Sequence, residues 1–278
     1  MVGKGSVNHN SRQFHARNTD PERSDQNVCY RHEPIEDVYH KLFDKALEEY
    51  NARQRRKNRC IPNYYEKICS GKQEKPFHEV ILQIGNREDT NAQSKDGPKA
   101  AAILDEYMKS FQDRNPYLRV FSAHLHMDEA TPHLHIDFVP FTTGGKQGLE
   151  TRVSLKQALA NQGFKGGSRQ ETEWNQWVQA EKEQLASIME RHGMEWEKKG
   201  THEKHLSVLD YEKKMRSEEV AALEQKLTHK AADLKNLTKR IDSLKENENQ
   251  IIETERQLVL LTGVPAAGTG VLDDRQKL

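Results

Sequence analysis

The sequence contains few cysteines and no long apolar segment. Its three cysteines form no CxxC pair, which argues against a disulfide framework and a cysteine zinc site. They are Cys29, Cys60 and Cys69, which we interpret as ordinary thiols in a reducing compartment. No apolar stretch approaches the roughly 20 residues of a membrane-spanning helix, and the N-terminus has no hydrophobic signal region. We therefore expect a cytoplasmic protein.

The chain also lacks an excess of charge of either sign. Lys and Arg number 43 and Asp and Glu number 43, so the formal net charge is zero. The basic excess that is common in nucleic-acid-binding proteins is therefore absent from the whole chain, although a local patch can still bind phosphate. One such patch is the run Arg53, Arg55, Arg56, Lys57 and Arg59. Its alternative interpretation is a solvated helix end.

Apolar residues are scarce for one compact globule of 278 residues. Hydrophobic residues make up 34% of the chain and charged residues 31%. This composition predicts one core of roughly 150–200 residues together with a solvated appendage. We expect a catalytic domain over residues 1–205 and a coiled-coil helix over residues 206–262. The tail, residues 263–278, has little structure signal and is expected to be disordered.

The coiled coil is predicted from apolar residues on alternating steps of three and four. They are Val220, Leu223, Leu227, Leu234, Leu237, Ile241, Leu244, Ile251 and Leu258. Glu248 and Glu255 fall in the same seam, where a carboxylate must be desolvated or reach back to water. The firm part of the coil should therefore end near Leu244. The alternative is a single amphipathic helix that packs on the domain.

The first 205 residues predict a mixture of helices and strands. The first thirty residues are polar and rich in turn formers, and a helix is expected over residues 35–50. Residues 77–84 predict a buried strand, and a helix over residues 98–111 should stop at Asn115-Pro116. Residues 118–127 and 133–139 predict an antiparallel hairpin, and helices are expected near Ser154 and over residues 174–189. We expect an α/β sandwich with a central antiparallel sheet, helices mainly on one face and a metal on the open face.

Three histidines fall on the predicted hairpin. Side chains alternate along a strand, so His133 and His135 share one face, and His126 lies across the turn from them. Three neutral nitrogen ligands leave room for water or substrate, as in a catalytic metal site. Such a metal could activate water or polarise a phosphate, and spacing alone does not decide between them. Histidines that merely fill a polar surface are the alternative, and we expect that role for His124.

The segment HMDEATPHLH, residues 126–135, resembles the signature of HUH endonucleases. More closely, it resembles that of the Mob/Pre plasmid mobilisation and recombination family, the MobV-type relaxases. A second stretch supports the resemblance, since His9-Asn10-Ser11-Arg12 is followed by Asp20-Pro21-Glu22-Arg23-Ser24 and by Asn27. It is similar to the family's N-terminal motif. The resemblance covers roughly residues 5–205.

The resemblance implies a bacterial HUH-type enzyme that nicks one strand of plasmid DNA at an origin of transfer. Such a relaxase recognises a hairpin and single strand, becomes covalently joined to the 5′ phosphate, and later rejoins the strand. His9 would be the nucleophile, since a neutral imidazole is available near an ordinary histidine pKa of about 6.5. The alternatives are Tyr30, Tyr64 and Tyr65. The ligands His126, His133 and His135 would hold a divalent metal. Manganese is expected, with magnesium or zinc as alternatives.

The remaining motif residues receive smaller roles from the resemblance. Arg12 is expected to bind phosphate or to pair with Glu129, which would orient His9 or accept its proton. Contacts to DNA are expected from Asn10, Arg12 and Arg23, with a structural salt bridge as the alternative for Arg23. Asp128 would share the role of Glu129 or would instead stabilise the turn. Asp137, which the family motif does not require, lies two residues beyond His135 on the same face and would be a partner of the metal ligands.

Other functions remain open from the sequence. An HUH-type replication initiator or a transposase-like nickase would share the metal and the fold but nick another target. A metal-dependent hydrolase of small substrates would need no DNA, and a DNA adaptor with a vestigial site would need no metal. The expected partners are single-stranded or hairpin plasmid DNA, a second copy bound through the coiled coil, and a mating-channel coupling protein.

Overall fold

The computed structural model describes residues 6–86, 90–145, 147–196 and 208–263. The chain divides into two units, Met1–Lys198 and Lys199–Leu278. The predicted junction at residue 205 lies outside the described residues, as does the predicted disordered tail apart from residue 263. Within the described residues, no helix is long and apolar enough to cross a membrane.

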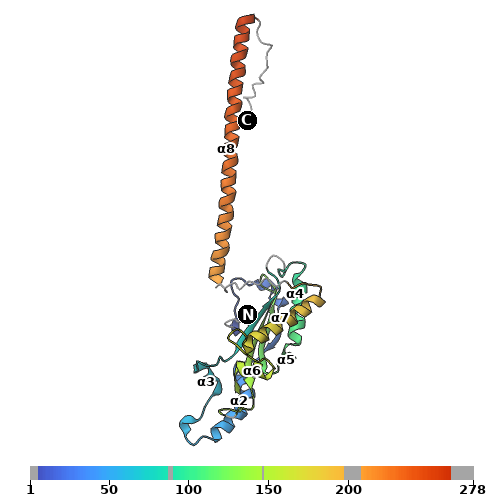
Figure 1. The fold of residues 1–278 in the computed structure, drawn as a ribbon, viewed down its shortest axis with the longest axis vertical. Coiled ribbons are helices and arrows are strands. Elements are labelled where there is room, and N and C mark those ends of the chain that lie inside the picture. The colour runs from blue at the N-terminus through green and yellow to red at the C-terminus, as the bar shows by residue number, and fades with distance from the viewer. Residues whose placement is uncertain (1–5, 87–89, 146, 197–207, 264–278) are drawn as a thin grey trace. The chain divides into compact units, whose positions relative to one another are not determined.

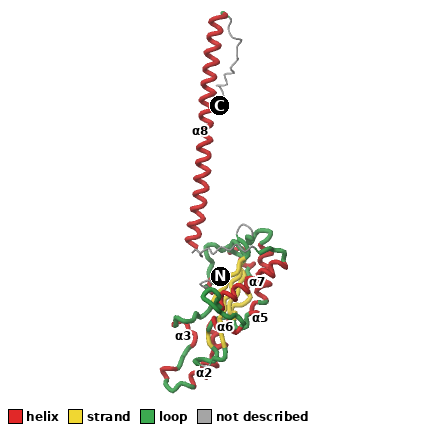
Figure 2. Tube along the Cα trace, in the orientation of Figure 1, coloured by secondary structure: helices red, strands yellow, loops and turns green. Residues whose placement is uncertain are grey.

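The first unit is built on an antiparallel sheet (Figures 1 and 2). Four strands follow the order β1 (Val28–His32), β3 (Leu118–His126), β4 (His133–Thr142) and β2 (His78–Gln83). The short strand β5 (Arg152–Val153) pairs with the end of β4. The predicted α/β fold with a central antiparallel sheet is confirmed, including the hairpin of β3 and β4. Strand β1 falls in the segment expected to be turn-rich, and so corrects that expectation.

Four helices cover one face of the sheet. They are α4 (Gly97–Lys109), α5 (Phe111–Arg114), α6 (Leu155–Asn161) and α7 (Glu173–Arg191). Their apolar side chains pack on Leu134, Ile136 and Phe138, the residues of β4 expected to face a core. The predicted helix over residues 98–111 is divided at Ser110, and α5 ends before Asn115-Pro116 as expected.

The other face of the sheet has a second, smaller core. The helices α2 (Ile35–Ala52) and α3 (Tyr64–Ser70) contribute to it, with the short helix η2 (Lys57–Arg59) between them. Phe121, Val139 and Val153 are the buried sheet residues of this core. The amino-terminal helices α1 (Val7–Asn10) and η1 (Pro21–Gln26) lie near the opposite end of β3, where α1 contacts that strand. The end of this face that carries His126, His133 and His135 is therefore covered, whereas an open face was expected there.

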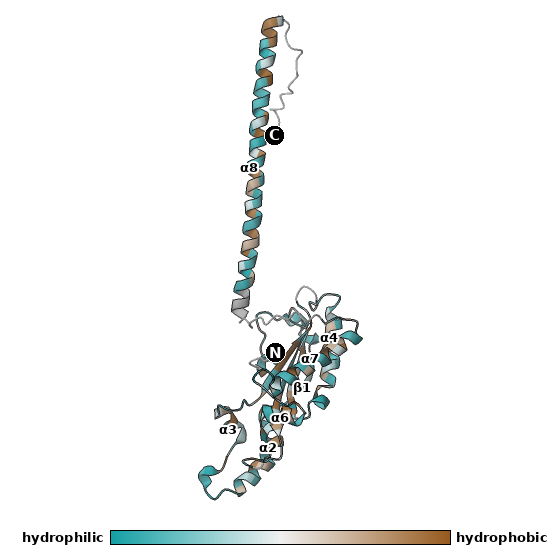
Figure 3. Cartoon of the chain, viewed as in Figure 1, coloured by the Kyte–Doolittle hydropathy of each residue, from teal (hydrophilic) through white to brown (hydrophobic). Residues whose placement is uncertain are grey.

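In the described part of the second unit, residues 208–263, the chain forms the helix α8 (Val208–Thr262), which confirms the predicted long helix. The nine apolar residues of the predicted seam are all exposed, from 46% for Ile241 to 68% for Leu227. Figure 3 shows hydrophobic patches spaced along an otherwise hydrophilic α8. Pairing of this helix with another stays a prediction.

Candidate functional site

Strand register brings the three predicted ligands together. His126 lies opposite His133 in the β3–β4 pair, and His135 is two residues further along β4 on the same face. One ring nitrogen from each histidine lies within 4.8 Å of the others, an arrangement that could hold a metal ion. All three side chains are buried, with exposed fractions of 0% for His126, 9% for His133 and 6% for His135.

Each of the three imidazoles is oriented by an oxygen outside the cluster. His126 Nε2 donates to the Asn10 carbonyl oxygen, and His133 Nδ1 donates to that of Thr131, both at 2.8 Å. His135 Nδ1 donates to Glu79 Oε1 at 2.8 Å. Because all three partners are acceptors, each fixes the proton of its imidazole on the outer nitrogen, the one that points away from the cluster. The inner nitrogen of each ring then carries a lone pair.

The inner nitrogens are suited to a cation. His135 Nε2 is buried and has no hydrogen-bond partner among the described residues. The nitrogens His126 Nδ1 and His133 Nε2 are 3.3 Å apart, so two lone pairs face each other. Two nitrogens on one tetrahedral metal, each at about 2.0–2.1 Å, would lie about 3.3–3.4 Å apart. The donor set therefore fits a divalent metal with imidazole ligands.

Burial also keeps two of these imidazoles, those of His126 and His133, neutral. It lowers the pKa of His126 to about 3, opposed by the hydrogen bond to Asn10 and reinforced by the neighbouring histidines. It lowers the pKa of His133 as well, with His135 acting in the same direction. An imidazole must be unprotonated at the ligating nitrogen to bind a metal, so these two rings can bind one at neutral pH.

The predicted nucleophile lies next to this cluster. His9 belongs to the single turn α1, whose N-cap Ser6 side chain accepts from the His9 backbone N–H. The His9 ring centroid is 6.0 Å from that of His126 and 6.2 Å from that of His135. His9 Nε2 is 3.5 Å from Glu129 Oε1, and 23% of the side chain is exposed. The structure thus brings together residues that are more than 100 positions apart in the sequence.

Arg12 joins the first motif to the second. Its guanidinium donates to both oxygens of Asp128 and, at 2.9 Å, to Glu129 Oε1. Its Nη1 also lies 3.3 Å from His9 Nε2 and donates to the His9 carbonyl oxygen. Arg12 has a positive φ of 54°, a conformation that non-glycine residues rarely adopt and that often accompanies a functional site. Of the two roles expected for Arg12, this geometry favours pairing with Glu129.

Asp128 and Glu129 are held as carboxylates. Burial raises the pKa of both, but hydrogen bonds outweigh it. Those from Arg12, Asn27 and Ser24 bring the pKa of Asp128 to about 2. For Glu129, the hydrogen bond to His9 and the Arg12 pair bring the pKa to about 2. Asp128 thus anchors the turn, as one of its expected roles required, while Glu129 faces the proposed nucleophile.

Asn10 and Arg23, both expected to contact DNA, make hydrogen bonds within the protein, and their contacts to DNA stay a prediction. Asn10 is 1% exposed, and its Nδ2 donates to Glu79 at 2.9 Å and to Asp137 at 3.0 Å. Arg23 donates to Asp20 and to the carbonyl oxygens of Met127 and Glu129. Its expected alternative, a structural salt bridge, is therefore present.

Two neighbours of the cluster differ from the sequence analysis. His124 is buried with an exposed fraction of 6%, so its expected surface role is wrong. Burial, reinforced by His32, lowers the pKa of His124 to about 4. Glu79, which holds His135, was not predicted at all. The available signal was a carboxylate inside the apolar run of residues 77–84, since such a residue is rarely buried without a partner. Asp137 supports the ligands only indirectly, through Asn10 and Glu79.

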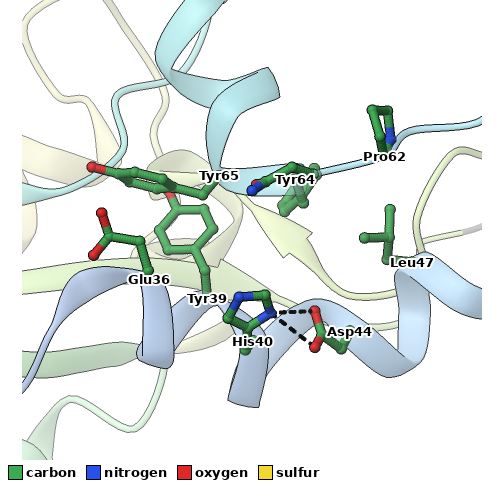
Figure 4. Close-up of a pocket in the computed structure, with 9 residues that line it drawn as sticks. Glu36, Tyr39, His40, Asp44, Leu47, Pro62, Tyr64 and Tyr65 are labelled. Carbon is green, nitrogen blue, oxygen red and sulfur yellow. Dashed lines mark hydrogen bonds and ion pairs between the residues drawn. The ribbon is translucent and has the colours of Figure 1, made fainter.

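The three tyrosines that were the alternative nucleophiles pack in or against the two hydrophobic cores. Tyr30 packs on the core beneath the helical face and donates to Asp105 at 2.8 Å. Tyr64 and Tyr65 line a small pocket between α2 and α3 (Figure 4). Its volume of about 70 Å³ is far below that of ordinary ligand sites. Burial raises the pKa of all three phenols, that of Tyr65 to about 12, which disfavours a phenolate nucleophile.

Known proteins that are similar to this chain include plasmid recombination enzymes. A family model described as plasmid recombination enzyme matches residues 6–213. A curated plasmid recombination enzyme from Bacillus sp. is 25% identical over 246 residues, which are 86% of this chain and 49% of that protein. The chain thus spans about half the length of this relative.

Solved structures of the MobM relaxase domain, Mn-bound and with plasmid pMV158 oriT DNA, are also similar. One has a TM-score of 0.45 at 19% identity and covers 77% of this chain and 96% of its own. Another has a TM-score of 0.45 at 22% identity and covers 76% and 90%.

Proposed function

This chain belongs to the Mob/Pre family of plasmid recombination enzymes, and from that premise we propose that it is a relaxase. It would nick one DNA strand at an origin of transfer, remain joined to the 5′ phosphate, and rejoin the strand afterwards. The observation that carries the proposal is the position of His9, whose ring lies about 6 Å from two members of a buried histidine cluster. A hydrolase of small substrates would need no such second imidazole.

In this proposal His126, His133 and His135 hold one divalent metal ion. Imidazole nitrogens suit transition-metal ions such as zinc better than magnesium, and among the transition metals we propose manganese. When bound, the metal would polarise the scissile phosphate and offset the negative charge that builds in the transition state. Hydrogen bonds to Asn10, Thr131 and Glu79 orient the three proposed ligands in the protein itself.

In the proposed chemical step, His9 is the nucleophile. Glu129 is 3.5 Å from His9 Nε2 and accepts its proton, while Arg12 Nη1 has the His9 carbonyl oxygen as its own acceptor. The lone pair is then on Nδ1, which attacks phosphorus. A nitrogen–phosphorus bond forms, the bond to the 3′ oxygen breaks, and that oxygen takes a proton from solvent. Rejoining reverses these events.

Arg12 is a positioning residue in this scheme. It holds Glu129 beside His9 and neutralises Asp128 within the turn, so it fixes the acceptor for the His9 proton. The DNA at an origin of transfer would contact the exposed edge of His9. We further propose that residues 1–205 form the relaxase domain, that α8 pairs with a second copy, and that a coupling protein receives the nucleoprotein product.

The covalent adduct provides the test. Purified protein is mixed with single-stranded oligonucleotides tiled across the region upstream of the gene, with Mn²⁺, Mg²⁺ or Zn²⁺, and adducts are resolved on denaturing gels. The wild type should form an adduct, and His9→Ala should abolish it while still binding metal. His15→Ala is the matched control, because His15 is an exposed histidine of the same segment.

Two results would contradict the proposal. If the wild type forms no adduct with any of the three ions on any oligonucleotide, the relaxase function is wrong. If His9→Ala forms as much adduct as the wild type, the nucleophile is another residue.

A further inference from the structure

The segment between α2 and α3 concentrates positive charge. Arg53, Arg55, Arg56, Lys57 and Arg59 all lie in it, and we call them the basic loop. No Asp or Glu occurs between Glu49 and Glu66. In a chain whose formal net charge is zero, such a local excess stands out from the average surface.

The charges of the basic loop are unneutralised. All five side chains are exposed, and within the part of the chain that the structure describes none forms an ion pair with a carboxylate. Only Arg53 makes a side-chain hydrogen bond, from Nε to the Glu49 carbonyl oxygen. Like charges so close together repel one another in the free protein, and an anionic partner would relieve that repulsion.

The loop is anchored at its base. The Asn51 side chain donates to the Ile61 carbonyl oxygen and accepts from the Ile61 backbone N–H, both at 2.8 Å. Ile61 is 6% exposed and belongs to the core under α2. The loop is thereby closed by one asparagine, and η2 forms a turn within it. Its cations are presented on a fixed base, which lowers the entropy cost of binding.

The basic loop also belongs to the same sheet face as the proposed active site. Val139, on which the α2 core packs, follows His135 by four residues on β4 and so shares its face. At about 3.4 Å per residue, the two side chains are about 14 Å apart along the strand. A strand of DNA bound at His9 could therefore extend over this face beyond the cleaved phosphate.

The chemistry favours a phosphate backbone over bases. Guanidinium groups pair with phosphate oxygens in a bidentate manner, and four of the five cations are arginines. Residues 51–63 contain no aromatic side chain on which a base could stack. Resting on the function proposed above, we propose that the basic loop binds the phosphodiester backbone of DNA outside the cleavage site, without reading its sequence.

Salt-dependent binding tests this proposal. The triple variant Arg55→Gln, Arg56→Gln, Arg59→Gln is compared with the control Lys182→Gln, Lys235→Gln, Lys239→Gln, which removes the same charge from exposed positions on α7 and α8. The probes are a short duplex and a single strand, both of random sequence. Three lost phosphate contacts should reduce the salt slope by about 2.7 for the duplex and about 2.1 for the single strand. Affinity at about 0.15 M salt should fall on the order of 100-fold for the duplex.

The outcomes separate this inference from the proposed function. If the loop variant binds only the duplex more weakly, the ligand of the loop is flanking duplex DNA. If it binds both probes more weakly, the loop binds the backbone of duplex and of single-stranded DNA alike. If the loop variant binds both probes with the wild-type slope and affinity, the inference is overturned even when the wild type forms its adduct. If the wild type neither binds DNA nor forms an adduct, both proposals fail. Circular dichroism melting verifies that each variant folds.

Discussion

Replacing Glu79 with glutamine should weaken metal binding at the histidine cluster by about 10-fold to 100-fold. Glu79 is 3% exposed, and its Oε1 accepts from His135 Nδ1 at 2.8 Å and from Asn10 Nδ2 at 2.9 Å. Glutamine keeps the size of the side chain but removes its charge. The His135 ring then loses a charge-assisted bond that makes it a better ligand and fixes its proton on Nδ1.

The expected loss can be stated as a free energy. A 10-fold to 100-fold change in dissociation constant corresponds to about 1.4–2.7 kcal/mol of binding free energy. Metal-dependent stabilisation of the fold should fall by the same amount when the metal is in large excess over the dissociation constant. Both quantities can be measured on the purified protein without any DNA, so this prediction does not depend on finding the nick site.

The assay is titration calorimetry of metal-free protein with Mn²⁺, supported by thermal melting with and without the ion. Glu181→Gln is the matched control, because Glu181 is a largely buried carboxylate that accepts from Arg114 and Asn115 on the helical face of the sheet. It should cost stability but leave the metal affinity unchanged. If Glu79→Gln binds Mn²⁺ as tightly as the wild type, Glu79 does not tune the site.

Three further predictions concern the rest of the chain. Arg12→Ala leaves the fully buried Asp128 carboxylate without its cation, so urea unfolding should show a loss of about 3–5 kcal/mol; a loss under about 1 kcal/mol would contradict the role given to Arg12. Burial, with a small contribution from Lys75, lowers the pKa of His78 to about 4. The folded protein therefore binds this proton less readily than the unfolded chain, and stability should fall by up to about 3 kcal/mol as pH drops from about 6.5 to about 4. His78→Phe should remove that part of the loss in urea unfolding at both pH values, and an identical loss in variant and wild type would refute the assignment. Finally, Leu237→Asp in the exposed seam of α8 should convert a coiled-coil dimer to monomer in sedimentation; a monomeric wild type would contradict the proposed pairing.

The elements best predicted from the sequence have strong local periodicity. The hairpin of β3 and β4 follows from alternation along two strands and a short turn, and the turn brings His126 opposite His133. Helix α2 follows from helical spacing of its apolar residues, and α8 from its heptads. In each case neighbouring residues carry the signal, so one sequence is sufficient.

The features that were missed depend on contacts between distant segments. Strand β1 is only five residues long, too short for its own pattern to identify it, and its pairing with β3 makes it a strand. His124 is buried because β1 and the amino-terminal segment lie near it, which spacing along β3 does not reveal. Glu79 is 56 positions from the histidine it holds. No periodicity along the chain encodes such a partnership.

Asn10 explains why the two motifs act together. Its carbonyl oxygen accepts from His126 Nε2, and its side chain holds Glu79, which in turn holds His135. The residue next to the proposed nucleophile therefore orients one proposed ligand directly and a second through Glu79. Any shift of α1 that moved His9 would also free both rings to rotate. The proposed nucleophile and two of the three proposed metal ligands are thus positioned by one connected set of hydrogen bonds.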